Sequence, residues 1–141
     1  MRTSLAGASL TDVSDSGRPL VQLVIPASPR YLRLARLTAA GLAGDLGFRV
    51  DAIEDLRVAV DELCAAIISG TPPEAELELT YRESAETLVV DGCCRSRTSN
   101  APELHGVARE LLNMLADEYS IGAVGGHRKF RLVKHAGGSS A

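Results

Sequence analysis

The sequence has little of what marks a nucleic-acid-binding, membrane-spanning or secreted protein. It contains two lysines, no tryptophan and only 4% aromatic residues, and its net charge of −3 includes no region where basic residues gather. A broad basic surface for DNA or RNA is therefore not expected. No run approaches the roughly 20 apolar residues that cross a bilayer. The first 17 residues also lack the apolar core of a signal peptide.

The chain has three cysteines, of which Cys93 and Cys94 are neighbours. An odd number with this spacing is no disulfide framework, and it predicts a cytoplasmic protein with reduced thiols. Cys93 and Cys94 with His105 or His127 lack the paired spacing of a zinc site. No pattern indicates a Cys–His nucleophile. Cys64 falls in an apolar helical stretch, where we expect it to pack as a small apolar side chain.

The length of 141 residues, with 45% hydrophobic and 23% charged residues, is typical of one globular domain. Residues 1–18 and 136–141 are rich in small and polar residues and show no periodicity. We expect both segments to be flexible tails. The folded domain is expected over residues 19–135.

The first half of this domain predicts one strand and two helices. A short apolar run at residues 19–25 is a strand candidate. The first helix is expected to begin with Ser28 as its N-cap and Pro29 at its first helical position. Its apolar stripe ends at Gly47, a residue typical of helix C-termini. A second, longer helix begins near Asp51.

The second half predicts two hairpins separated by a helix. Strands are expected at 76–81, 87–91, 118–124 and 128–135, with a helix at 107–115 and a loop at 92–104. The order is therefore β-α-α-β-β-α-β-β. Grouped helices and sequential hairpins predict an α+β fold, a two-layer α/β sandwich whose mixed, mostly antiparallel sheet has helices on one face. The regular βαβ alternation of a Rossmann-type sheet is absent.

The second helix carries the most informative polar residue. Between residues 58 and 68 it is apolar nearly all round, except for Asp61 and Glu62. A carboxylate in an apolar helix must be paired, hydrated or neutralised. Glu62 is therefore a candidate general base or a residue that orients water. The alternative is a structural carboxylate at the edge of the core, solvated or paired with an arginine.

Three segments of the first half resemble a known family. The first segment runs from IPASP at residues 25–29 through RLT at residues 36–38. The other two are LGF at residues 46–48 and IEDLRVAVDELC at residues 53–64. They resemble RsbW- and SpoIIAB-type anti-sigma factors, the small serine-kinase branch of the superfamily that includes gyrase and histidine kinases. The resemblance covers residues 20–135 and implies the histidine-kinase-like ATPase (Bergerat) fold. It also implies a homodimer that sequesters a sigma factor, uses ATP and Mg²⁺, and is released by a STAS-type antagonist.

The resemblance assigns roles to residues of the nucleotide site. Glu62 matches the glutamate that activates the serine hydroxyl of a partner protein, but Ala66 replaces the Mg²⁺-binding asparagine and offers the metal no oxygen. Asp91 and Gly92 match the start of the adenine-binding Asp-x-Gly-x-Gly motif, although the spacing differs and no second glycine follows. Asp-Gly is also an ordinary turn dipeptide. Gly106 is the single glycine where active members have a phosphate-binding glycine-rich lid.

These departures decide between a binding protein and an enzyme. Phosphoryl transfer depends on positioning and on charge neutralisation by the metal. Losing a metal ligand and the phosphate-binding backbone reduces turnover by many orders of magnitude. The sequence therefore favours an anti-sigma factor with weak or no kinase activity. The alternatives are an active ATP-dependent serine/threonine kinase that phosphorylates the antagonist, and a scaffold that binds antagonists but no sigma factor.

Three arginines mark the expected partner-binding surface. Arg30, Arg33 and Arg36 recur at three-residue spacing along the first helix. Arg36 best matches a family arginine that contacts both the sigma factor and the antagonist. Arginine is enriched at interface hot spots, and sigma-factor segments are often acidic. The alternative is a solvated helix face.

Overall fold

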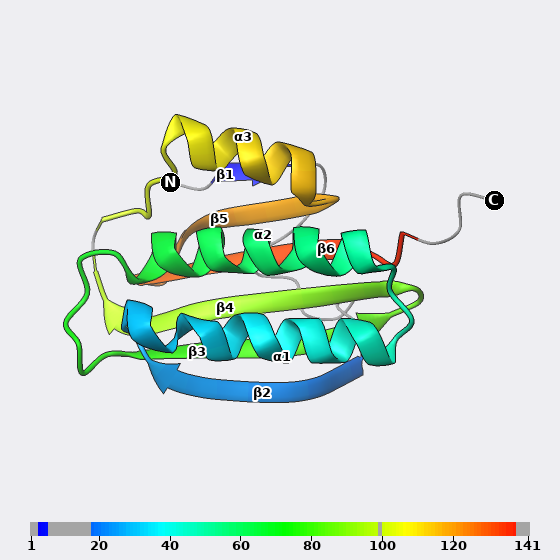
Figure 1. Ribbon diagram of the computed structural model, residues 1–141. Helices are drawn as coiled ribbons and strands as arrows, with labels where there is room; N and C mark the ends of the chain where they lie inside the picture. Colours follow the sequence, from blue (N-terminus) through cyan, green and yellow to red (C-terminus); the bar gives the residue numbers. More distant parts are fainter. Residues whose placement is uncertain (1–2, 6–17, 99, 138–141) are drawn as a thin grey trace.

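The computed structural model describes residues 3–5, 18–98 and 100–137. It has two layers, a six-stranded sheet and helices that cover one of its faces (Figure 1). The strands are β1 (Thr3–Leu5), β2 (Arg18–Pro26), β3 (Glu76–Ser84), β4 (Thr87–Arg97), β5 (Glu118–Val124) and β6 (His127–His135). The helices are the 3₁₀ turn η1 (Pro29–Tyr31), α1 (Leu32–Asp45), α2 (Val50–Ile68) and α3 (Gly106–Leu115).

The sheet confirms the predicted fold class and order of elements. Its strand order is β1-β5-β6-β4-β3-β2, and every pairing among these described strands is antiparallel. The α1–α2 hairpin returns the chain to the end of the sheet where β2 stops, so β3 runs antiparallel to β2. None of the described helices is long and apolar enough to span a membrane.

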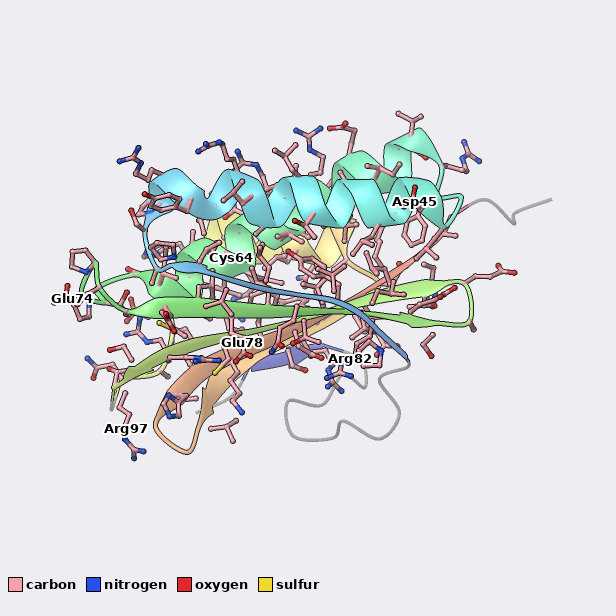
Figure 2. The ribbon with its side chains drawn as sticks, turned by 90° about the horizontal axis from the view of Figure 1, so that it is seen from below. Asp45, Cys64, Glu74, Glu78, Arg82 and Arg97 are labelled. Atoms are coloured by element: carbon pink, nitrogen blue, oxygen red, sulfur yellow. The ribbon has the colours of Figure 1, made fainter. Side chains whose placement is uncertain are left out.

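The core lies between the sheet and the helices. Alternate side chains of the central strands point toward the helices, as Leu77 and Leu79 of β3 and Leu88 of β4 do. The buried Tyr81 hydroxyl donates to the Ala35 carbonyl oxygen at 3.0 Å, which joins β3 to α1. Figure 2 shows the sheet from its edge with the helices above it, and Glu78 and Arg82 lie on the side of the sheet away from the helices.

The start of α1 differs in detail from the prediction. Ser28 is extended, with φ −138° and ψ 139°, and Pro29 follows as expected, but the Ser28 side chain makes no capping hydrogen bond. The 3₁₀ turn η1 comes first, and α1 begins at Leu32. At the other end, Gly47 has φ +83°, a conformation that favours glycine and ends the helix as predicted.

Two segments contain more regular structure than the sequence pattern indicated. The predicted loop at 92–104 is wrong in its first part, because β4 continues to Arg97. Cys93 lies opposite Glu78 of β3 on one side and Lys129 of β6 on the other, so this part of β4 is an interior strand whose successive residues bond alternately to its two neighbours. Within the predicted tail 1–18, residues 3–5 form β1, which pairs with β5. Residues 6–17 and 138–141 of the two predicted tails lie outside the described residues.

Candidate functional site

Glu62 lies at the middle of α2 on a partly covered face of the helix. Its side chain is half-buried, and it has no hydrogen bond or ion pair with any residue that the structure describes. One turn further on, Ala66 is buried, and Ser69 follows at the end of the helix. A half-buried carboxylate without a protein partner is held by water, so it remains available to a bound molecule.

A polar cavity of about 640 Å³ begins one helical turn from Glu62. Its lining combines the end of α2 with the segment before α3 and the start of β6. The lining residues are Ala66, Ser69, Asn100, Ala101, Pro102, Glu103, His105 and Arg128. This volume falls in the range of small-molecule sites.

Arg128 links two walls of this cavity. Its guanidinium donates to the carbonyl oxygen of Asn100 at 3.1 Å and to that of Ser69. The side chain is 9% exposed, so these carbonyls compensate much of the cost of burying its charge. The cation also interacts favourably with the negative end of the α2 dipole. Arg128 therefore holds the segment before α3 against the end of α2.

Ala66 has only a methyl group at the position where the resemblance implies a metal-binding amide. The residues that the structure describes include no group of three His, Cys, Asp or Glu side chains suited to a metal, and the oxygen-bearing side chains of the cavity lining are Ser69, Asn100 and Glu103. Gly106 is exposed at the start of α3, and a Cβ there would meet no atom within 4 Å. Hence no contact with the described protein atoms requires a glycine at this position.

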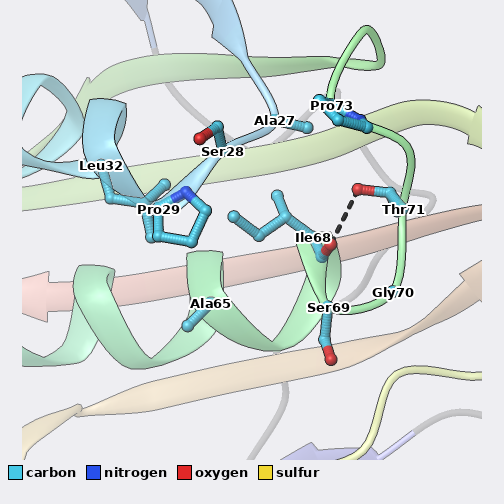
Figure 3. Close-up of a pocket in the computed structure, with 10 residues that line it drawn as sticks. All are labelled: Ala27, Ser28, Pro29, Leu32, Ala65, Ile68, Ser69, Gly70, Thr71 and Pro73. Carbon is cyan, nitrogen blue, oxygen red and sulfur yellow. Dashed lines mark hydrogen bonds between the residues drawn. The ribbon is translucent and has the colours of Figure 1, made fainter.

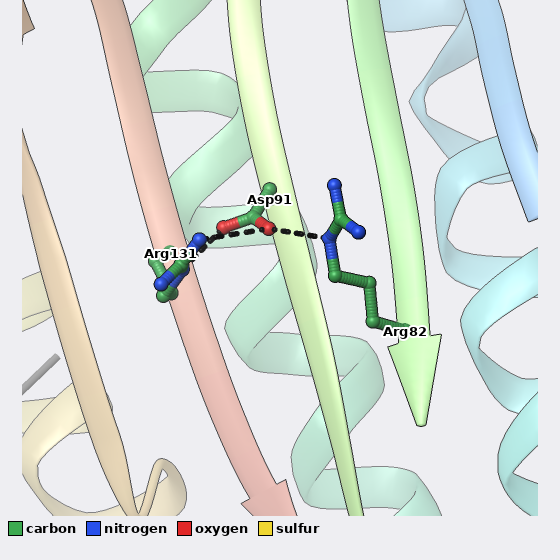
Figure 4. A network of polar contacts seen from close by, with 3 residues as sticks. All are labelled: Arg82, Asp91 and Arg131. Carbon is green, nitrogen blue, oxygen red and sulfur yellow. Dashed lines mark hydrogen bonds and ion pairs between the residues drawn. The ribbon is translucent and has the colours of Figure 1, made fainter. Parts of the chain in front are cut away.

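Asp91 lies on the other face of the sheet. Val90 and Gly92 point toward the helices, so Asp91 between them points away. There its Oδ1 accepts from Arg131 Nε at 2.6 Å and its Oδ2 from Arg82 Nε at 3.3 Å, as Figure 4 shows. In the structure Asp91 is thus an ion-pair residue of the helix-free face, and its expected role in adenine binding stays a prediction.

Gly92 has a packing reason to be glycine. An added Cβ would lie 2.2 Å from the Phe130 ring on the neighbouring strand β6. The expected role of Gly92 in nucleotide binding stays a prediction. The next helix-facing side chain along β4 is the buried Cys94. The structure thus brings Glu62 and Ala66 together near the cavity, but it does not bring Asp91 to them.

The three predicted arginines lie together at the start of the helical layer. Arg30 is exposed and stacks over the Tyr31 ring, with 5.2 Å between guanidinium carbon and ring centroid. Arg33 is exposed and donates to the Arg30 carbonyl oxygen at 3.0 Å. Arg36 forms an ion pair with Asp61 of α2 at 2.6 Å, and the two side chains are 33% and 40% exposed. Arg36 therefore joins α1 to α2 while part of its guanidinium faces solvent.

The cysteines have the surroundings of packing residues. All three thiols are free, and Cys64 and Cys94 are fully buried. Burial raises the pKa of the Cys64 thiol far above its ordinary value, and the nearby Asp61 raises it further. Burial also raises the pKa of Cys93. A nucleophilic cysteine needs a lowered pKa, so neither thiol has that character.

Sequence reasoning missed two contacts of this region. Arg128 comes from a strand far along the chain, and no local pattern marks it. Asp61 is the polar neighbour of Glu62 in the sequence, and its position one residue away on α2 turns it toward α1 and Arg36. That helical offset is the only signal in the sequence that could have indicated the pair.

Comparisons with known proteins identify relatives for most of the chain. No family model matches. The chain is 36% identical over 76 residues to the serine-protein kinase RsbW of Bacillus cereus strain ATCC 10987, covering 50% of this chain and 48% of that protein. This alignment therefore spans about half of the relative. The chain is also 30% identical over 121 residues to serine-protein kinase RsbW of Bacillus mycoides strain KBAB4 and of Bacillus cereus strain B4264. Each of these alignments covers 72% of this chain and 76% of the relative.

Proposed function

The chain belongs to the family of the serine-protein kinase RsbW, and from this premise we propose that it is an anti-sigma factor. It sequesters a sigma factor in the cytoplasm as a homodimer, and binding of a STAS-type antagonist to this chain sets the sigma factor free. The observation that supports the proposal is the combination of exposed arginines on η1 and α1 with a cavity in which Ala66 offers no oxygen to a metal. We infer that the binding surface of the family is kept and that its catalytic site is changed.

The changes in the cavity argue against phosphoryl transfer as the main activity. On the resemblance, Ala66 removes a metal ligand, and Gly106 is the single glycine where active members have a phosphate-binding glycine-rich lid. Preorganised groups of this kind each contribute about 3 kcal/mol to transition-state stabilisation. Two such losses slow the reaction by about four orders of magnitude, since each 1.36 kcal/mol is a factor of ten.

Glu62 supports a second candidate, an ATP-dependent serine/threonine kinase that phosphorylates the antagonist. Its carboxylate is half-buried, has no partner among the described residues and lies one turn from the cavity. Calorimetric titration with Mg²⁺-ATP and labelled phosphate transfer to the purified antagonist test this activity. Transfer that is lost in Glu62→Gln would establish the kinase; no heat and no transfer would eliminate it.

Affinity capture from the protein's own cell extract tests the main proposal. The tagged chain should retain a sigma factor, and an added antagonist should displace it. The matched control is Arg36→Ala, which keeps the fold but removes the expected contact. Capture of antagonists without any sigma factor would instead identify a scaffold and overturn the anti-sigma function.

A further inference from the structure

An apolar pocket of about 380 Å³ lies between the start of α1 and the end of α2 (Figure 3). Its apolar lining consists of Ala27, Pro29, Leu32, Ala65, Ile68 and Pro73. Of the described lining residues it shares only Ser69 with the polar cavity near Glu62. The apolar pocket is therefore separate from the polar cavity.

The pocket lacks strong polar groups that would select a polar ligand. The Thr71 hydroxyl donates to the Ile68 carbonyl oxygen at 2.7 Å, so its proton is already used within the wall (Figure 3). Ala65 is exposed to solvent although it is part of the lining. An open apolar pocket of this kind gains free energy when an apolar group displaces its water.

The Arg36–Asp61 pair borders the pocket along the seam between the two helices. Arg36 follows the lining residue Leu32 by one turn of α1, and Asp61 precedes the lining residue Ala65 by one turn of α2. The ion pair thus lies one helical turn from the pocket on both helices. Because it is partly exposed, a carboxylate from outside can approach the Arg36 guanidinium.

The α1 side of the pocket is basic. Arg30 follows the lining residue Pro29, and Arg33 follows Leu32. Both arginines are exposed, and neither has an acidic partner among the residues that the structure describes. The charge of this rim therefore complements an acidic segment.

We propose that the pocket is the anchor site for one large apolar side chain from an acidic segment of the sigma factor. Carboxylates that flank this side chain bind Arg33 and Arg36, and one of them competes with Asp61 for Arg36. A buried apolar anchor surrounded by polar contacts is the usual arrangement of an interface hot spot. This inference rests on the proposed function in taking the sigma factor as the partner.

Site-specific photocrosslinking tests where the partner binds. Benzoylphenylalanine in place of Arg30, an exposed position beside the lining residue Pro29 that does not itself line the pocket, should crosslink to the captured sigma factor. The crosslinked peptide should contain a large apolar residue with Asp or Glu within four positions. The matched control carries the crosslinker at Met114, an exposed position on α3, and should give no such product. Crosslinks from position 114 alone, or to a segment without acidic residues, would overturn the proposal.

Filling the pocket tests what the site contributes. Ala65→Leu should weaken sigma-factor binding at least tenfold, because the added side chain occupies the place of the anchor. Ala108→Leu on α3 makes the same change outside the pocket and should leave the dissociation constant unchanged; the thermal midpoints of both variants check that they fold.

If Ala65→Leu binds normally while Arg36→Ala binds weakly, the pocket inference fails and the anti-sigma function stands. If the chain captures no sigma factor, the proposed function fails. The pocket is then judged by the position-30 crosslink alone: a product with an acidic, apolar segment of another protein supports it, and any other result refutes it.

Discussion

Arg128 provides a sharp test of how the candidate cavity is built. Its guanidinium binds the Ser69 and Asn100 carbonyl oxygens and is almost fully buried. Hydrogen bonds to charged groups contribute about 1.5–3 kcal/mol each. In Arg128→Met the cavity lets water reach the two carbonyls, and the cost of burying the guanidinium disappears. Two such bonds contribute at least about 3 kcal/mol, and the relief of the burial cost offsets part of this, so we expect a net loss of about 2 kcal/mol of unfolding free energy.

Urea denaturation measures this loss, and thermal unfolding should show a midpoint lower by about 4–8 °C. Arg128→Lys is the control, because an ammonium keeps the charge but cannot bridge two carbonyls as a planar guanidinium does. Its loss should be intermediate. Hydrogen exchange at residues 100–105 should accelerate in Arg128→Met more than exchange in β3 does, since the tie to α2 is local. A loss below about 0.5 kcal/mol with unchanged exchange would refute the bridging role, because hydrogen bonds to charged groups contribute more than that.

Three further predictions concern the partner surface, the sheet and the thiols. Arg36→Ala should weaken sigma-factor binding by more than about 1 kcal/mol, as expected for a hot-spot arginine, and an unchanged dissociation constant in calorimetry would remove Arg36 from the interface. Gly92→Ala should lower the unfolding free energy by about 1–3 kcal/mol, because its methyl group meets the Phe130 ring; adding Phe130→Leu should recover part of that loss in urea denaturation, and no recovery would contradict the steric cause. Cys93, whose pKa burial raises, should react with iodoacetamide only at a higher pH than free cysteine does, and a faster reaction near pH 7 would contradict this direction.

The sequence predicted the elements where periodicity alone decides them. The alternation at residues 76–81 and the helical stripe of α2 appear in the structure as expected. The extension of β4 to Arg97 was missed because Gly92, Cys93 and Cys94 have little strand propensity of their own. Pairing with β3 and β6 on both sides outweighs that local preference.

The candidate site was predictable only as far as one helix determines it. Glu62 and Ala66 share a face because four residues make about one helical turn. The direction of the Asp91 side chain was not predictable, because the face on which a strand residue lies depends on register. A shift by one residue turns the side chain to the other side of the sheet. Arg36–Asp61 depends on how α1 packs on α2, and Arg128 on how β6 lies near the end of α2. Such contacts between distant segments have no signature in the local pattern.

The central claim is that this chain binds a sigma factor through a surface that does not need the nucleotide site. Its most direct test is the dissociation constant for the captured sigma factor, measured by calorimetry with and without Mg²⁺-ATP. We predict the same constant in both conditions, and no change when Glu62 is replaced by glutamine. Binding that requires Mg²⁺-ATP, or that is lost in Glu62→Gln, would contradict the account.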